Sequence, residues 1–455
     1  ARLHELGYTN GERVLTRIGQ LRESALFRRM SASTQGRLDA LGPRIVEAAC
    51  KVPNPDITFE RLLNILESIG RREAYLALLL EYAGARERVV HLASASPWAA
   101  SYLARHPVLL DELVSDRQPE PPDWTALGKE LRATLDQSGD GIERQMDLLR
   151  NFKQVHTFRL LIQDLAGQLP LESLSDHLSD LASTIVQEVL RLCWSYLNSE
   201  HAPRFAVIGY GKWGGKELGY ASDLDLIFLY DADDALERYT RLAQRVNTWL
   251  TTFTPAGILY DIDLRLRPDG DAGMLVSHIG AFEEYQLHKA WVFEHQAMTR
   301  ARFVAGDAQI GARFEALRQK ILTTPRDLST LRGEIASMRQ RMLEGHPNKS
   351  GLFDIKHDRG GIVDVEFIVQ YLVLGYAHQY PQLTGNIGNL ALLKLAASLG
   401  LILSELASAV HHSYREFRRM QHSMRLQDER YARTDPSQTQ PLVAPVLALW
   451  QAVFD

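Results

Sequence analysis

Apolar side chains recur at intervals of three and four residues along most of the chain, and this spacing predicts helices. Phe59, Leu62, Leu63 and Leu66 follow the pattern closely. The periodicity resumes from about 124 to 197, after a proline-rich break at 119–122, and again from about 282 to the end. Most of the chain is therefore expected to be helical.

Three segments have a different pattern. Residues 205–209 form a short apolar run that ends in glycine, whereas residues 222–230 and 259–268 alternate apolar and polar positions. These patterns are typical of strands. We therefore expect one small α/β unit between two helical regions.

Composition narrows the class of protein. The 455 residues suggest about three domains at roughly 150 residues each. A net charge of −5 argues against a protein that coats nucleic acid nonspecifically. Two cysteines, Cys50 and Cys193, exclude a disulfide framework and fit a reducing compartment. No apolar run is long enough to span a membrane. The first residue is Ala1 rather than Met, so we expect a fragment of a longer protein.

A glycine-rich segment follows the first predicted strand. Residues 209–214 read G-x-G-x-x-G, but only seven residues, 216–222, separate Gly215 from Asp223. That spacer is too short for the crossover helix of a dinucleotide-binding unit, and no G-K-[ST] follows as a P-loop would require. Two interpretations stay open. The segment is either an ordinary turn or a loop whose N–H groups hold phosphates, with help from Lys212 and Lys216.

Carboxylates share one face of the predicted strands. Side chains alternate along a strand, so Asp223 and Asp225 point the same way. An exposed acidic edge strand is the simpler interpretation of this pair alone. Asp263, on the third predicted strand, would complete a clamp for two metal ions at a reacting phosphate. Arg265 and Arg267, expected on the same strand face, would either neutralise phosphate charge or pair with the aspartates.

A further segment, 294–302, is expected to be helical. His295, Arg300 and Arg302 lie on it, and we interpret them mainly as packing or surface residues.

Together these strings resemble the DNA polymerase beta-like nucleotidyltransferase superfamily. The match is closer to the glutamine synthetase adenylyltransferase family, on residues 209–220, 222–226, 263–268, 294–302 and 354–367. The resemblance extends from about Phe59 to about Gln427. One departure is the short segment 231–235, where that family usually has a longer polar insertion.

The resemblance implies a mostly α chain with an inserted α/β nucleotidyltransferase unit that has a polymerase beta-like mixed sheet, followed by a helical bundle. The implied domains are a helical connecting region at 1–118, a nucleotidyltransferase domain at 119–310 with its core near 203–305, and a C-terminal bundle at 311–455. The family has two related halves, one that removes AMP from glutamine synthetase and one that adds it. This chain resembles the adding half.

The implied reaction moves AMP from ATP to a tyrosine of glutamine synthetase and releases pyrophosphate. Asp223, Asp225 and Asp263 would hold two Mg²⁺ ions, and Asp263 would also accept the tyrosine proton. The residues that would contact the triphosphate are Gly214, Gly215, Ser222, Lys212, Lys216, Arg265 and Arg267.

The resemblance also implies a cytoplasmic enzyme regulated by glutamine and the PII signalling protein, and joined to an adenylyl-removing half. Neither nucleic acid nor membrane is an expected partner. Three rivals stay open. They are phosphorolytic removal of AMP, a docking module without catalysis, and a polynucleotide polymerase, which the negative charge and the missing basic, aromatic groove disfavour.

Overall fold

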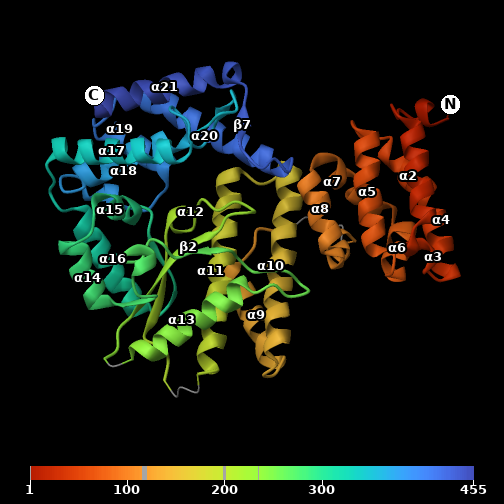
Figure 1. Cartoon of the computed structure of the whole chain (residues 1–455), viewed down its shortest axis with the longest axis horizontal. Helices are drawn as coiled ribbons and strands as arrows, with labels where there is room; N and C mark the ends of the chain where they lie inside the picture. Colours follow the sequence, from red (N-terminus) through yellow and green to blue (C-terminus); the bar gives the residue numbers. More distant parts are fainter. Residues whose placement is uncertain (1, 115–119, 198–200, 234) are drawn as a thin grey trace. The chain divides into compact units, whose positions relative to one another are not determined.

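The computed structural model describes residues 2–114, 120–197, 201–233 and 235–455 (Figure 1). Its chain forms two compact units. The first comprises residues 1–121, 154–170 and 423–430, and the second comprises 122–153, 171–422 and 431–455. The expected domain boundary at 118/119, and Pro119 with it, lies outside the described residues. The predicted predominance of helix is confirmed.

The first unit is built from short helices. Serine and asparagine side chains begin several of them. Asn10, Ser24, Ser31 and Ser96 each accept a backbone N–H at a helix start. The elements are α1 (Arg2–Glu5), α2 (Gly11–Glu23), α3 (Ala25–Arg28), α4 (Ala32–Ala49), α5 (Pro55–Ile69), α6 (Glu73–Glu81), α7 (Ala83–Ala95), α8 (Pro97–Arg105) and the 3₁₀ helix η1 (Pro107–Leu113).

Two long helices, α10 (Ile142–Leu165) and α20 (Ser404–Leu426), contribute residues to both units. The other helices of the second unit are α9 (Trp124–Gln137), α11 (Leu171–Ser195), α12 (Gly211–Gly214), α13 (Leu236–Thr251), η2 (Gly270–Ala272), α14 (Ile279–His288), α15 (Val292–Met298), α16 (Ala308–Leu322), α17 (Leu328–Gly345), α18 (Ile362–Tyr376), η3 (Pro381–Thr384), α19 (Asn389–Ser398) and α21 (Pro436–Phe454).

A mixed sheet occupies the second unit. Its strands are β1 (Phe205–Gly209), β2 (Leu224–Tyr230), β3 (Ile262–Asp263), β4 (Val276–His278) and β5 (Arg302–Gly306). The order is β3-β2-β1-β5, with β4 also paired to β2. β1 is antiparallel to β2 and β5, whereas β3 and β4 run parallel to β2. A separate pair joins β6 (Phe353–Asp354) to β7 (Arg433–Thr434).

Helices pack on both faces of this sheet (Figure 1). On one face, the ring of Phe205 stacks on Tyr239 of α13, with 5.6 Å between centroids, and α13 packs against α11. On the other face, α16 presents Gly311 to the ring of Phe303. A Cβ at Gly311 would lie 2.5 Å from that ring, so glycine permits the close approach. Both faces of β1 and β2 are consequently buried, as their apolar sequences require.

One strand prediction and one helix prediction were partly wrong. The third predicted strand, 259–268, contains only two strand residues, and residues 265–267 form a turn. The segment 294–302 is not one helix, because α15 ends at Met298 and Arg302 begins β5. Within the described residues, no helix is long and apolar enough to cross a lipid bilayer.

Candidate functional site

The glycine loop, residues 209–215, follows β1, and residues 216–223 lead from it into β2. Tyr210 N donates to Asp225 O at 2.8 Å, which ties the loop to β2. Gly211 has a φ of +55°, and a Cβ there would lie 2.2 Å from Asp225 Oδ2. Glycine is therefore required by both conformation and space. The loop closes directly over the Asp225 carboxylate.

Two of the three predicted carboxylates are neighbours across parallel strands. Asp225 of β2 pairs in register with Asp263 of β3, so the two side chains share a face of the sheet. Asp223 is exposed, just before β2. Burial, followed by repulsion from Asp223 and Asp263, raises the pKa of Asp225 to about 6. Asp223 and Asp263 thus lie within electrostatic reach of Asp225, and a joint role of the three at a metal stays a prediction.

Asp263 is engaged by Arg265. The Arg265 backbone N donates to Asp263 Oδ1 at 2.9 Å, and its Nε donates to Oδ2 at 2.9 Å. Hydrogen bonds from the guanidinium are the main reason that the pKa of Asp263 is lowered. The sequence left open whether Arg265 neutralises phosphate charge or pairs with an aspartate, and in the structure it pairs with Asp263.

The oxygen donors suit a hard divalent cation, because the repulsion that raises the pKa of Asp225 is what a cation would relieve. Among the side chains that the structure describes, however, no three His, Cys, Asp or Glu residues stand ready to hold a metal ion. Asp263 would have to leave Arg265 to join Asp223 and Asp225. The donor chemistry of these carboxylates fits Mg²⁺.

The two lysines near the loop differ in environment. Lys216 has a φ of +53°, and its Nζ lies 3.0 Å from Asp180 Oδ1 on α11. Burial, followed by repulsion from Lys356, lowers the pKa of Lys212. Lys212 also lowers the pKa of Asp225, so it lies within electrostatic reach of that carboxylate. Of the two predicted lysines, Lys212 is the one whose charge acts on Asp225.

Two other predicted contact residues serve local structure. Ser222 Oγ accepts a hydrogen bond from Gly219 N at 3.0 Å and so closes the turn before β2. Arg267 donates to the carbonyls of Leu264, Asp271 and Gly273 at 2.8, 3.1 and 3.3 Å. These bonds fold residues 264–273 into the turn that ends β3 early. A phosphate role for Arg267 stays a prediction, but its guanidinium is already occupied by carbonyls.

Residues from β5 and the turn before it hold the loop, which the sequence interpretation missed. Arg302 Nη2 donates to Trp213 O at 3.1 Å. A Cβ at Gly214 would lie 2.0 Å from Arg300 O, and one at Gly215 would lie 2.8 Å from Arg300 Nε. The sequence predicted that these arginines pack or lie on the surface, and the structure places both of them against the loop backbone. The apolar run that ends in Gly306 was the available signal for a strand here.

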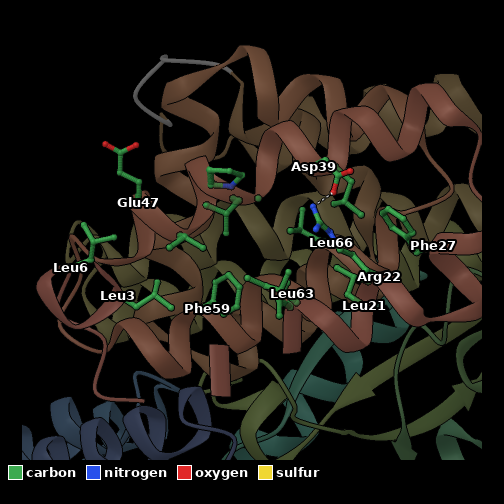
Figure 2. Close-up of a pocket in the computed structure, with 16 residues that line it drawn as sticks. Leu3, Leu6, Leu21, Arg22, Phe27, Asp39, Glu47, Phe59, Leu63 and Leu66 are labelled. Atoms are coloured by element: carbon green, nitrogen blue, oxygen red, sulfur yellow. Dashed lines mark hydrogen bonds and ion pairs between the residues drawn. The ribbon is translucent and has the colours of Figure 1, made fainter. Parts of the chain in front are cut away.

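A cavity of about 560 Å³ lies in the first unit (Figure 2). None of the residues that line it is a predicted catalytic residue. An ion pair between Arg22 and Asp39, 2.7 Å apart, lies among its lining residues. Most of the lining is aliphatic or aromatic, including Phe59, Leu63 and Leu66. Its lining holds no cluster of groups suited to phosphate chemistry.

Comparison with known sequences identifies the family. Residues 86–317 match the family described as Glutamate-ammonia ligase adenylyltransferase, and residues 330–451 match GlnD PII-uridylyltransferase. Relatives named bifunctional glutamine synthetase adenylyltransferase/adenylyl-removing enzyme include that of Aromatoleum aromaticum, 55% identical over 92% of this chain and 45% of the relative. Those of Nitrosomonas europaea and Chromobacterium violaceum are each 51% identical, over 99% and 100% of this chain and 51% of each relative. The chain spans about half the length of these relatives. It belongs to the glutamate-ammonia ligase adenylyltransferase family.

Proposed function

We propose that this chain transfers AMP from ATP to a tyrosine hydroxyl of glutamine synthetase and releases pyrophosphate. The observation that carries the proposal is the pairing of Asp225 and Asp263 on neighbouring parallel strands under a glycine loop, in a member of this family. Two acidic strand residues beside a loop of backbone donors suit transfer of a nucleotidyl group.

In the proposed reaction the tyrosine oxygen attacks the α-phosphorus of ATP. A new oxygen–phosphorus bond forms, the bond from the α-phosphorus to the bridging oxygen breaks, and pyrophosphate leaves with the electron pair. The phenolic proton passes to a carboxylate, for which Asp263 is the predicted acceptor. Its pKa is lowered by Arg265, so acceptance requires that Arg265 first release it.

The proposed ligand set is Asp223, Asp225 and Asp263 for Mg²⁺, which supplies charge stabilisation at the reacting phosphate when bound. Backbone donors of Gly214 and Gly215 and the ammonium of Lys212 would lie against the triphosphate. Lys212 is supported by its electrostatic coupling to Asp225. Ser222, Lys216, Arg265 and Arg267 belong to the same proposal, but each already has an internal partner.

Further parts of the proposal concern the whole protein. We propose a DNA polymerase beta-like sheet, the domain division 1–118, 119–310 and 311–455, and a cytoplasmic enzyme. The names of the relatives support an adenylyl-removing half in the same polypeptide. The match of residues 330–451 to a PII-uridylyltransferase supports regulation through PII, and glutamine remains the proposed effector.

The test incubates the purified chain with unmodified glutamine synthetase, Mg²⁺ and ATP labelled at the α-phosphate. We expect label on glutamine synthetase and release of pyrophosphate. Asp225→Asn should lower the rate at least 100-fold, as expected for loss of a metal ligand. Asp261→Asn is the matched control, because the Asp261 charge acts on Lys153 and is absent from the groups that shift the pKa of Asp225.

A second arm separates the reverse activity, which the relatives' names also carry. Adenylylated glutamine synthetase and phosphate replace the first substrates, and ADP is measured. ADP without label transfer would reverse the assigned direction. Neither product, with ATP still bound, would favour a docking module.

A further inference from the structure

Glu217 follows the glycine loop by two residues and is held by Arg300, in the turn before β5, and by Arg418 of α20. Arg300 Nη2 lies 2.5 Å from Glu217 Oε2, and Arg300 Nη1 lies 2.6 Å from Glu366 Oε1 on α18. Arg418 of α20 lies 3.6 Å from Glu217 Oε1. Burial acts to raise the pKa of Glu217, but Arg300 and Arg418 outweigh it and hold the pKa below its ordinary value. The carboxylate therefore stays ionised although it is only 8% exposed.

Two polar side chains complete the environment of this carboxylate. Tyr414, fully buried on α20, donates its hydroxyl to Glu217 Oε2 at 3.1 Å. Asn389, the first residue of α19, donates from Nδ2 to Tyr414 Oη at 2.8 Å. Glu217 thus contacts Asn389 of α19 and Tyr414 of α20 directly, whereas Glu366 of α18 is linked to it only through Arg300.

The same helical region also reaches the loop backbone. Asn386, just before α19, donates to Gly214 O at 2.8 Å. Glu217 N donates to Lys212 O at 2.7 Å, so a displacement of Glu217 would shift Lys212 and the turn between them. Because Gly211 packs against the Asp225 carboxylate, that shift would reach the predicted catalytic residue.

Stability alone is a weak reason for such a cluster. Buried ion pairs lose much of their attraction to desolvation, and apolar side chains of similar volume often stabilise a fold equally well. What a fully satisfied polar network does better is fix one geometry. Here the geometry that it fixes is that of the backbone proposed to hold the triphosphate.

We propose that Glu217 and Tyr414 are positioning residues, through which helices α18 to α20 hold the glycine loop in the conformation that aligns ATP with Asp225. This inference rests on the proposed AMP transfer. Neither side chain touches substrate in this scheme. Their effect is to place Lys212, Gly214 and Gly215, and small misplacements of such groups cost large factors in rate.

The test is Tyr414→Phe, which removes one hydroxyl and keeps the ring. We expect kcat/KM for ATP to fall about tenfold, because a hydrogen bond to a buried charge is lost next to the loop. The KM for glutamine synthetase should change less than twofold. The matched control is Tyr371→Phe on α18, since Tyr371 is 2% exposed and packs against Phe454 instead of Glu217. Both variants lose a buried phenol hydroxyl from the same group of helices.

The comparison of the two variants decides the inference. A fall confined to Tyr414→Phe, at thermal midpoints that match for the two variants, supports positioning. Equal activity in the two variants, or equal loss in step with stability, overturns it. If the unmodified chain transfers no AMP at all, the proposed function fails. The positioning inference is then judged by the affinity for Mg²⁺-ATP, which only Tyr414→Phe should weaken.

A double variant gives a second measurement. Asn389→Ala removes the donor to Tyr414 Oη and should lower kcat/KM for ATP by a smaller factor. Combined with Tyr414→Phe, the two losses should be less than multiplicative, because Asn389 Nδ2 donates to Tyr414 Oη at 2.8 Å and only at 3.5 Å to Glu217 Oε1 itself. Multiplicative losses would contradict the chain of contacts from Asn389 through Tyr414 to Glu217.

Discussion

Asp225 shows how a single candidate catalytic residue lowers the stability of the folded protein. Its pKa is raised to about 6 by burial and by Asp223 and Asp263. A raised carboxyl pKa means that the folded protein binds the proton more tightly than the unfolded chain. The associated stability is therefore full below about pH 4 and is lost as the pH rises through 6. In metal-free protein, Asp225→Asn should raise the free energy of unfolding at pH 8 by roughly 2 kcal/mol.

Thermal unfolding in EDTA at pH 8 and pH 4 measures this prediction. The stabilisation should appear at pH 8 and vanish at pH 4, while AMP transfer is lost at every pH. Asp261→Asn should change neither quantity. A variant at Asp225 that is destabilised equally at both pH values would show that its carboxylate is not repelled by its neighbours.

Gly211 allows a prediction about space around the same carboxylate. Gly211→Ala forces a side chain onto a φ of +55° and places its Cβ 2.2 Å from Asp225 Oδ2. The backbone strain should cost about 1–2 kcal/mol. Because the contacted oxygen ends a rotatable side chain, Asp225 should turn away rather than unfold the protein. Activity should therefore fall at least 100-fold, well beyond what the change in stability explains.

Gly139→Ala separates strain from contact. Gly139 has a φ of +72°, and a Cβ there would meet nothing within 4 Å. Urea unfolding should show similar losses for both alanine variants, whereas only Gly211→Ala should lose AMP transfer. Full activity in Gly211→Ala would mean that the loop does not close over Asp225 during the reaction.

At the scale of elements, the sequence predicts what is coded locally and misses what depends on distant partners. β1 was predicted with its observed bounds, 205–209, because its apolar run ends at a glycine. β3 is shorter than the alternation suggested, since Arg267 bonds to carbonyls of Leu264, Asp271 and Gly273 and folds the chain. The pattern of apolar and polar residues in this segment does not predict those hydrogen bonds.

The candidate site shows the same difference between residues that local patterns predict and residues that depend on distant contacts. The aspartates were found because two acids on a strand are unusual and their spacing fixes a common face. The network of Glu217, Tyr414 and Asn389 joins residues up to 197 positions apart, and each is individually unremarkable in its helix or loop. A buried polar network of this kind becomes visible only when the fold brings its members together.

Arg150 gives a prediction about how one helix end is held. From α10 it donates to Gly257 O at 2.6 Å and Thr252 O at 2.5 Å, at the carboxyl end of α13, and it is fully buried. Arg150→Met keeps much of the volume but removes the guanidinium from both carbonyls, and Gly257 O then keeps only its hydrogen bonds from Thr254. The expected cost is about 3–4 kcal/mol. Urea unfolding of Arg144→Met, an exposed arginine on the same helix, should differ from the unmodified protein by less than about 0.5 kcal/mol.

An equal cost for the two arginine variants would mean that the buried guanidinium contributes no more than its aliphatic stem. Water would then hydrogen-bond to the carbonyls that lost the guanidinium. The turn at 252–257 leads into β3, so a loosened α13 end should also lower AMP transfer, through Asp263.

At the scale of the whole molecule, the chain crosses between compact units several times. Residues 154–170 and 423–430 belong with 1–121, although the intervening residues belong to the other unit. The sequence carries no mark of such a crossing, since α10 continues as one helix, Ile142–Leu165, from one unit into the other. The division into domains at about 118 and 310 therefore remains a proposal. The stability of one unit can be measured through a buried titratable side chain within it.

His156 is such a group for the first unit. It is 7% exposed on α10, and burial, followed by the charge of Arg159, lowers its pKa to about 4. Because the folded pKa lies below the unfolded value of 6.5, stability is full above pH 6.5 and is lost as the pH falls toward 4. Between pH 7.5 and 5 the loss should be about 2 kcal/mol. His156→Gln cannot take up the proton and should lose that much less stability over this interval.

The control His91→Gln replaces an exposed histidine in the same unit and should follow the unmodified protein. Calorimetric unfolding at both pH values measures the difference, and an acid sensitivity that persists in His156→Gln would place its origin in other residues.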